Sequence, residues 1–515
     1  MKLSNNKQLL VNLAASVIAV MVQFIISFWV SPYVIGKLGE SAYGFITLAI
    51  NFTEYATFLT VAVNSMASRF ISIEYNKGNI KSANEYFSSV FWFNAVLSVV
   101  IFALSVILIF NIERIINIDD YMVRDVKITF FLTFITLITS FTSTAYVSTT
   151  FITNRMDINA YVQIFSRLIK LLVTIGCLVM FTPRIYYVSF GNLIATLFVL
   201  IVYCFIRKRL VPEFKICLDN FRFNKLITVA KSGLWMLLSN ISGLLLNGMD
   251  LLIANLMVSQ SAMGRLSVSK QIPIALSSLL GYLTNIFSAS FTQLVALDKK
   301  DELINEVNFT LRILGFFLTV PFAGIIIYGT EFLLLWLPND VYVQAEILEI
   351  YILMMLTLSN NIVNAYMYSI HSLYIAVNKV KMYAVVIFVC GIVSILTTLF
   401  LTKFTSLGVY AIAGTSTIIL SLVNLFWVPL YIERALGLKT FTLFRSIEKS
   451  YLGLLITCFV FFCMKPLFCF NSWMYFLVSV FIAALFGYAL NMFIILNSND
   501  RMRIMQVMKT KRGRK

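Results

Sequence analysis

Apolar runs long enough to cross a bilayer recur along the whole chain. A transmembrane helix needs about 20 mainly apolar residues, and such runs extend from near the first residue to near the last. We expect an all-α polytopic membrane protein with about fourteen such helices. The predicted spans are 9–35, 41–67, 87–111, 127–153, 158–182, 186–206, 228–258, 265–295, 306–328, 341–373, 382–403, 405–430, 450–468 and 472–497.

Composition agrees with the hydrophobic pattern. Of 515 residues, 60% are hydrophobic and only 12% are charged, whereas about a quarter of the residues of a soluble protein are charged. The seven cysteines are an odd number and form no CxxC motif, so neither a disulfide framework nor a metal site is expected.

Basic residues are distributed unevenly between the two predicted sides of the membrane. With both termini cytoplasmic, 29 of the 40 lysines and arginines fall on the inner side and eight on the outer side. This asymmetry is the positive-inside rule. The net charge of +17 is therefore interpreted as a topology feature. The basic tail MKTKRGRK is expected to contact membrane lipids, and no nucleic acid is expected as a partner.

The longest hydrophilic connection, 207–225, separates six predicted spans from the next six. We therefore predict an N-terminal six-helix lobe at 1–210 and a second six-helix lobe at 227–430. Two additional helices and the basic tail follow at 431–515. A shift of 220 residues lays SAYG (41–44) over SAMG (261–264). Two parallel repeats with a substrate site between them are a common transporter plan.

Several predicted spans have one polar face, because their polar residues recur every three or four positions. In the second span these residues are Thr47, Asn51, Glu54, Thr57, Asn64 and Ser68, and in the fifth Asn159, Gln163, Ser166, Arg167, Lys170 and Thr174. In the seventh span they are Asn240, Gly243, Asn247 and Asp250, and in the tenth Asn361, Asn364, Tyr368 and His371. The pattern predicts a hydrated cavity between the lobes.

The charges within the spans predict a modestly cationic cavity. Within the predicted spans, three cations outnumber two carboxylates. Further arginines lie at the predicted inner and outer mouths of the cavity. The candidate substrate-binding residues are Arg167, Lys170, Arg69, Arg155, Lys270, Arg265, Glu54, Asp250, Asn51 and Asn247. Arginine and lysine in such a place suit an anionic substrate group.

A structural interpretation of the same stripes remains open. Polar side chains also join membrane helices by interhelical hydrogen bonds. Arg167 could pair with Glu54, and Lys270 with Asp250, because buried ions need partners. Pro273 and Pro321 predict breaks in two helices of the second half.

No motif for ATP binding, serine hydrolysis or zinc-dependent proteolysis occurs. We therefore expect no catalytic residue, no cofactor, no metal site and no enzymatic activity.

Three stretches resemble a known family. They are SPYVIGKLGESAYGFITL (31–48), NSMASRFISIEYNKGN (64–79) and the region 232–273 with SGLWMLLSNISG and SAMGRLSVSKQIP. They are similar to the bacterial Wzx-type polysaccharide flippases of the multidrug/oligosaccharidyl-lipid/polysaccharide exporter superfamily.

The resemblance implies a function and a location. Its members move undecaprenyl-diphosphate-linked oligosaccharides from the cytoplasmic to the outer leaflet of the bacterial inner membrane by alternating access. The product is O-antigen, capsule or exopolysaccharide, and polysaccharide polymerase and chain-length machinery are implied partners. Arg69 matches the basic position ending the second span, and Asp250 matches the acid of the seventh. The first span departs from the pattern, because its first cation is Lys37, beyond its end.

Two other functions fit the sequence less well. A drug/cation antiporter of the same superfamily needs carboxylates in its cavity, and the first span has none. A membrane polysaccharide polymerase needs a large outer loop, and an acyltransferase needs a buried histidine with acids. Here the outer loops are short and His371 is the only histidine.

Overall fold

The computed structural model describes residues 5–503 except 279, 281–290, 292–293, 296, 298, 339–340, 378–379 and 440. The described part of the chain is almost entirely helical and has no strand. Thirteen of its helical segments are long and apolar enough to cross a membrane. Much of the predicted span 265–295 lies outside the described residues, so the count of about fourteen stays a prediction.

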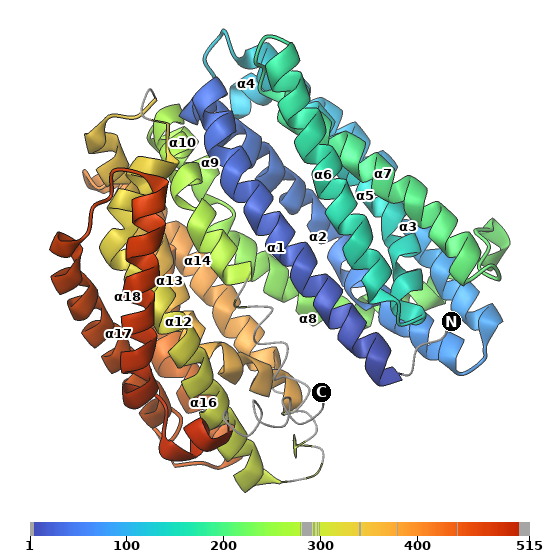
Figure 1. The fold of residues 1–515 in the computed structure, drawn as a ribbon. Coiled ribbons are helices and arrows are strands. Elements are labelled where there is room, and N and C mark those ends of the chain that lie inside the picture. Colours follow the sequence, from blue (N-terminus) through green and yellow to red (C-terminus); the bar gives the residue numbers. More distant parts are fainter. Residues whose placement is uncertain are drawn as a thin grey trace. The chain divides into compact units, whose positions relative to one another are not determined.

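The helices follow one another through short connections (Figure 1). The first half contains α1 (Asn5–Leu38), α2 (Glu40–Asn76), α3 (Ile80–Phe110), α4 (Ile112–Ile115), α5 (Val123–Ile152), α6 (Met156–Met180), α7 (Tyr186–Leu210), η1 (Leu218–Asn220), α8 (Phe223–Asn247), α9 (Asp250–Met257) and α10 (Gln260–Ser269). The second half contains α12 (Lys300–Trp336), α13 (Gln344–Ala376), α14 (Val380–Phe404), α15 (Val409–Leu422), η2 (Val423–Trp427), α16 (Val428–Leu436), α17 (Phe444–Met464), η3 (Lys465–Leu467) and α18 (Trp473–Ile494).

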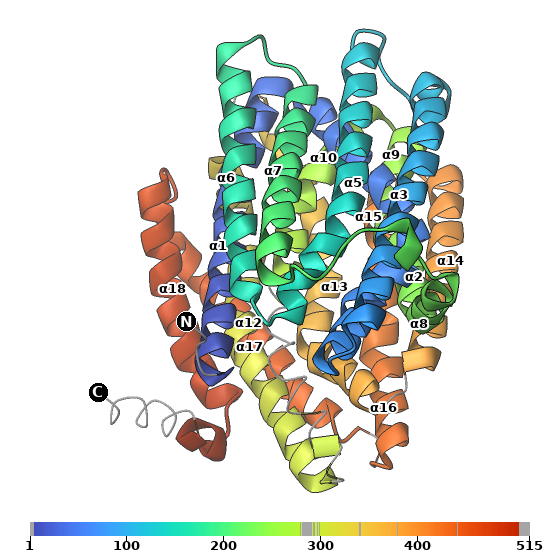
Figure 2. The same ribbon diagram turned by 90° about the vertical axis from the view of Figure 1, so that its right-hand side faces the viewer.

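The helices group into two compact units by their contacts. Unit 1 comprises 1–268 with 402–409, and unit 2 comprises 269–401 with 410–515. In unit 1, α5 packs against α2, α3 and α7, and α6 packs between α1 and α7 (Figures 1 and 2). Phe87, Tyr203 and Phe214 are fully buried in its core.

α2 and α8 approach each other so closely that only glycine fits. A Cβ on Gly233 would lie 1.9 Å from the carbonyl oxygen of Ala62. Membrane helices gain no hydrophobic energy from pairing within lipid, so small residues that bring backbones together are a main source of packing energy. The seventh predicted span is thereby held against the second.

The two copies of the SAYG/SAMG repeat contact each other. A Cβ on Gly44 would lie 3.1 Å from the Cα of Gly264, the residue 220 positions later. The next related pair, Thr47 and Ser267, is joined by a 2.8 Å hydrogen bond from the serine hydroxyl. Residues that a shift of 220 positions relates therefore meet where α2 crosses α10.

The connection between α7 and α8 packs along α3. The amide of Lys215 donates to the side chain of Asn84 at 3.0 Å, and Ser88 donates to the carbonyl of Lys215 at 3.0 Å. The amide of Arg222 donates to the hydroxyl of Ser89 at 2.8 Å. This predicted cytoplasmic loop is thus an ordered part of unit 1.

α9 is anchored at the other end of unit 1. Asn255 is fully buried and exchanges three hydrogen bonds of 2.8–3.0 Å with Asn117, in the connection before α5. Together with the α2–α8 contact, this explains why unit 1 includes α8, α9 and α10. The contact units thus divide the chain differently from the predicted lobes 1–210, 227–430 and 431–515, which describe topology and stay a prediction.

Unit 2 is built around α12. It packs against α13, α17 and α18, and Pro321 lies inside it without ending it. The buried hydroxyl of Tyr328 donates to the carbonyl of Phe461 in α17 at 3.1 Å. Asn491 of α18 donates to Thr457 of α17 at 2.7 Å. A short π-helix, η2, interrupts the helix formed by α15 and α16.

We predict that Gly233→Ala destabilises the protein, because the added methyl group would overlap the α2 backbone. The expected loss is about 1–3 kcal/mol, measured as a lower melting temperature of the purified protein in detergent. Gly243→Ala is the matched control on the same helix, where a Cβ has no neighbour within 4 Å. Its effect should stay within about 1 kcal/mol and be stabilising, because alanine favours a helix more than glycine does. Equal melting temperatures for the two variants would contradict the close approach.

Candidate functional site

The seventh predicted span is not a continuous helix. α8 ends at Asn247, and α9 begins at Asp250. The carbonyl oxygen of Gly248 accepts hydrogen bonds from Tyr55 at 2.6 Å and Asn51 at 3.3 Å, both on α2. A backbone group freed at a helix break within a membrane must be satisfied by neighbouring protein or water. Asn51 of the predicted polar stripe and Tyr55, which lies outside that stripe, do this here.

Hydrophilic and small residues are exposed along these two packed helices. Glu54 on α2 is exposed, and so are Asn240, Gly243 and Asn247 on α8. Asp250 is half-buried at the first turn of α9. Polar groups within a membrane span are costly next to lipid, so they mark a face that meets water or protein. The polar stripes of α2 and α8 thus form one candidate surface within unit 1.

The polar stripe of α6 has a different environment. Tyr203 of α7 donates to Asn159 at 2.5 Å, and Ser166 donates to the carbonyl of Ala195, also in α7, at 3.3 Å. Thr174 is fully buried, and a Cβ on Gly191 of α7 would lie 2.4 Å from its hydroxyl oxygen. Half of this stripe therefore joins α6 to α7, as the structural interpretation expects.

Arg167 connects α6 to α1. Its guanidinium donates to the carbonyl of Ala19 at 2.8 Å. Near this contact, Ala15, Ala19 and Ala160 form a small apolar cluster with Ile164. Arg167 thus has a role in helix packing, and its pairing with Glu54 stays a prediction.

Arg155 belongs to a capping network at the start of α6. Its Nε and Nη2 each lie 3.0 Å from an oxygen of Asp157, which is buried. The amide of Asp157 donates to the side chain of Asn12 at 3.0 Å, and Asn12 donates to the carbonyl of Asn154 at 3.1 Å. The network ties α1 to α6, so the Arg155 charge is already neutralised.

Arg265 also lies beside a carboxylate. Its Nε is 3.7 Å from Glu40 at the start of α2, and both side chains are largely buried. The pair spans the crossing of α2 and α10 that Gly44 and Gly264 form. Lys270 belongs to unit 2, so its pairing with Asp250 stays a prediction.

Arg69 and Lys170 remain as cations without a carboxylate. Within the described part of the chain, neither side chain has a hydrogen-bond or ion-pair partner. Arg69 is exposed near the end of α2, and Lys170 is half-buried on α6. Of the predicted cationic residues in unit 1, these two are best placed to contact an anion.

The tenth predicted span also uses its polar residues for packing inside unit 2. Asn361 donates to the carbonyl of Pro273 at 2.8 Å and accepts from Ser277 at 2.9 Å. Asn424 of η2 donates to Asn364 at 2.6 Å. The side chains of Tyr368 and His371 lie outside the described residues.

Sequence reasoning missed the break in the seventh span and its partner Tyr55. The signal was present, since Asn247-Gly248 is a turn dipeptide inside an apolar run. Tyr55 follows Glu54 directly but is apolar enough to pass as a packing residue. Among the described residues, no group of three or more His, Cys, Asp or Glu side chains could hold a metal ion.

Comparison with known proteins places this geometry in a wider context. A family model described as "Polysaccharide biosynthesis protein" matches residues 9–288. An uncharacterized membrane protein, EpsK of Bacillus subtilis (strain 168), is 26% identical over 437 residues, which are 85% of each chain.

Solved structures share the fold at low identity. The lipid II flippase MurJ in an inward closed conformation aligns with a TM-score of 0.64 at 15% identity, covering 93% of this chain and 97% of that one. The MATE multidrug transporter DinF-BH aligns with a TM-score of 0.61 at 16% identity, covering 83% and 97%.

We predict that Arg155→Gln lowers the melting temperature of the purified protein, because it leaves the buried Asp157 carboxylate without its ion pair. The expected loss is about 1–3 kcal/mol. Arg69→Gln is the control, since it removes an exposed arginine that has no described partner. If Arg69→Gln were the more destabilising of the two, the structural role given to Arg155 would be wrong.

Proposed function

Because the chain belongs to the polysaccharide biosynthesis protein family, we propose that it moves an undecaprenyl-diphosphate-linked oligosaccharide across the bacterial inner membrane. Family membership together with the fold supports a membrane flippase or transporter role. The finer proposal is transfer from the cytoplasmic to the outer leaflet by alternating access, for surface polysaccharide synthesis. Both termini would be cytoplasmic, and polysaccharide polymerase and chain-length machinery would act with it.

The observation that carries the proposal is the exposed hydrophilic face on two packed membrane helices. Glu54 of α2 and Asn240 and Asn247 of α8 are exposed within helical segments that are long and apolar enough to cross a membrane. A sugar headgroup would lose many hydrogen bonds in hydrocarbon, each costly to give up. Such a cargo needs a path of polar side chains and water, and this face supplies one wall of it.

The diphosphate needs positive charge that is not already neutralised. Arg155 and Arg265 lie beside carboxylates, and Arg167 donates to a backbone carbonyl. Arg69 and Lys170 are therefore the residues that we assign to the diphosphate. An arginine can bind two phosphate oxygens at once, whereas a lysine acts as a point charge.

Reconstitution tests the function directly. The purified chain would be placed in liposomes containing undecaprenyl-diphosphate-linked oligosaccharide, and sugars in the outer leaflet would be oxidised with membrane-impermeant periodate. We expect the oxidised fraction to rise with time beyond that of protein-free liposomes. No rise, together with uptake of a cationic dye by the same liposomes, would favour a drug/cation antiporter instead.

We predict that Arg69→Gln combined with Lys170→Gln lowers this flipping rate about tenfold or more. The free energy lost with one hydrogen bond to a charged group corresponds to a change of about this size. The matched control is Lys208→Gln with Arg209→Gln, which removes an exposed lysine and an exposed arginine from the predicted cytoplasmic side of unit 1. Rates would be compared at equal protein content. A rate that is unchanged in the first variant, or equally low in both, would remove Arg69 and Lys170 from the mechanism.

We predict that a disulfide between Thr47→Cys and Ser267→Cys stops flipping until it is reduced. These residues join α2 to α10, helices of the two predicted lobes, near the predicted outer end of α2. Opening toward the outer side requires this crossing to separate. The control is Thr133→Cys with Ser189→Cys, whose hydroxyls lie 2.9 Å apart on α5 and α7 of one predicted lobe. If the oxidised Thr47/Ser267 pair transports at the normal rate, the crossing is static.

A further inference from the structure

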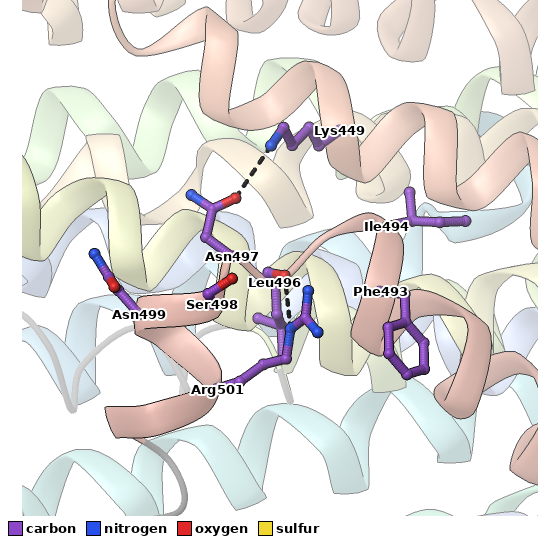
Figure 3. Close-up of a pocket in the computed structure, with 8 residues that line it drawn as sticks. All are labelled: Lys449, Phe493, Ile494, Leu496, Asn497, Ser498, Asn499 and Arg501. Carbon is purple, nitrogen blue, oxygen red and sulfur yellow. Dashed lines mark hydrogen bonds between the residues drawn. The ribbon is translucent and has the colours of Figure 1, made fainter.

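A cationic pocket lies in unit 2, where the start of α17 meets the segment after α18 (Figure 3). Its volume is about 410 Å³. Lys449 lines one side and Arg501 the other, with Asn497 between them, and Asn499 completes the polar lining. The ring of Phe493 forms an apolar edge, and the Arg501 guanidinium lies 5.1 Å from its centre.

The two cations are oriented by neutral groups and keep free donors. Lys449 donates to the side-chain oxygen of Asn497 at 3.1 Å, and Nε of Arg501 donates to the carbonyl of Leu496 at 3.2 Å. Within the described part of the chain, the terminal guanidinium nitrogens of Arg501 and the amide nitrogens of Asn497 and Asn499 have no protein partner. These donors are available to an oxygen-rich anion.

The nearby carboxylates are already neutralised by other arginines. Asp500 is buried and forms a two-point ion pair with Arg312, at 2.6 and 3.0 Å. Glu306 forms a similar pair with Arg503, at 2.9 and 3.1 Å. Glu448 is adjacent to Lys449 in sequence but does not line the pocket. The pocket therefore keeps its positive charge.

The pocket lies at the end of two helices that face lipid. The candidate spans are Ile447–Leu467 and Trp473–Ile494. Leu455, Phe459 and Phe493 on these helices are each about two-thirds exposed, which is expected for side chains that contact acyl chains. An anion in the pocket would thus lie at the level of the headgroups, on the side where the predicted topology places the cytoplasm.

We propose that this pocket binds the phosphate of an anionic phospholipid headgroup. Basic pockets between membrane helices on the cytoplasmic side suit such headgroups, and arginine with lysine offers both two-point and single contacts to phosphate oxygens. The lipid-facing helices below the pocket favour a lipid-borne phosphate over a free one. All residues of this pocket lie in unit 2, and none of them is assigned to flipping.

The test uses the purified full-length protein in neutral detergent. Its melting temperature would be followed during titration with short-chain phosphatidylglycerol, short-chain phosphatidylcholine or inorganic phosphate at constant ionic strength. Binding to the folded state raises the melting temperature. We expect a saturable rise with phosphatidylglycerol and a much smaller one with either of the other probes.

Two double variants test whether the rise in melting temperature comes from lipid binding in this pocket. Lys449→Gln with Arg501→Gln should weaken phosphatidylglycerol binding about tenfold or more. Arg434→Gln with Lys439→Gln removes two exposed cations from the same predicted side of unit 2 and should leave binding unchanged. Equal binding by both pairs would overturn the proposal. A response to inorganic phosphate as strong as that to phosphatidylglycerol would assign the site to free phosphate and overturn the lipid source.

A second measurement covers the case in which the pocket variant does not fold. The unaltered protein would be irradiated with a photoactivatable phosphatidylglycerol, and the labelled peptides would be identified by mass spectrometry. We expect labelling within residues 444–503 that excess phosphatidylglycerol prevents. Labelling that is confined to other segments would show that the pocket does not bind the lipid.

Discussion

The backbone of α2 is approached closely by two other helices, and much of unit 1 depends on these contacts. Gly233 of α8 leaves no room for a methyl group beside Ala62, and Gly264 of α10 leaves none beside Glu40. Within a bilayer, helices cannot gain stability by leaving water, so dispersion at short range and hydrogen bonds must hold them together. α2 also packs against α3 and α5. It is thereby the common neighbour of early and late segments of unit 1.

This close packing determines which polar groups remain available. With α8 fixed against α2, Tyr55 and Asn51 reach the Gly248 carbonyl, and this carbonyl at the break between α8 and α9 is satisfied by protein side chains. Glu54, on the same stripe, stays exposed. The adjacent residues Glu54 and Tyr55 can therefore serve two purposes, because residues one position apart on a helix point in directions about 100° apart.

Apolar length was sufficient to predict thirteen helical segments of the described chain, because a bilayer imposes a similar length and apolarity on each of them, but it did not predict the break between α8 and α9. It could not predict what each polar stripe faces, since water and a neighbouring helix select for the same residues. Asn159 and Ser166 turned out to bond α7. The Arg155–Asp157 pair is two residues apart in sequence, yet its importance depends on Asn12 from α1, a contact that no local pattern specifies. The close approach at Gly233 was equally hidden, because Gly243 on the same helix has open space.

Two groups of cations can be distinguished by their partners. One group stabilises the fold, and the other is available to bind a ligand. Arg155, Arg265 and Arg312 each lie beside a carboxylate, and removing such an arginine would leave an uncompensated charge. Lys170 and Arg501 have no carboxylate partner among the described residues, so no opposite charge of the protein offsets the cost of their desolvation. A phosphate can offset it, whether from a lipid-linked sugar or from a membrane lipid. Net charge alone does not distinguish the two groups, since every one of these residues contributes equally to the total of +17.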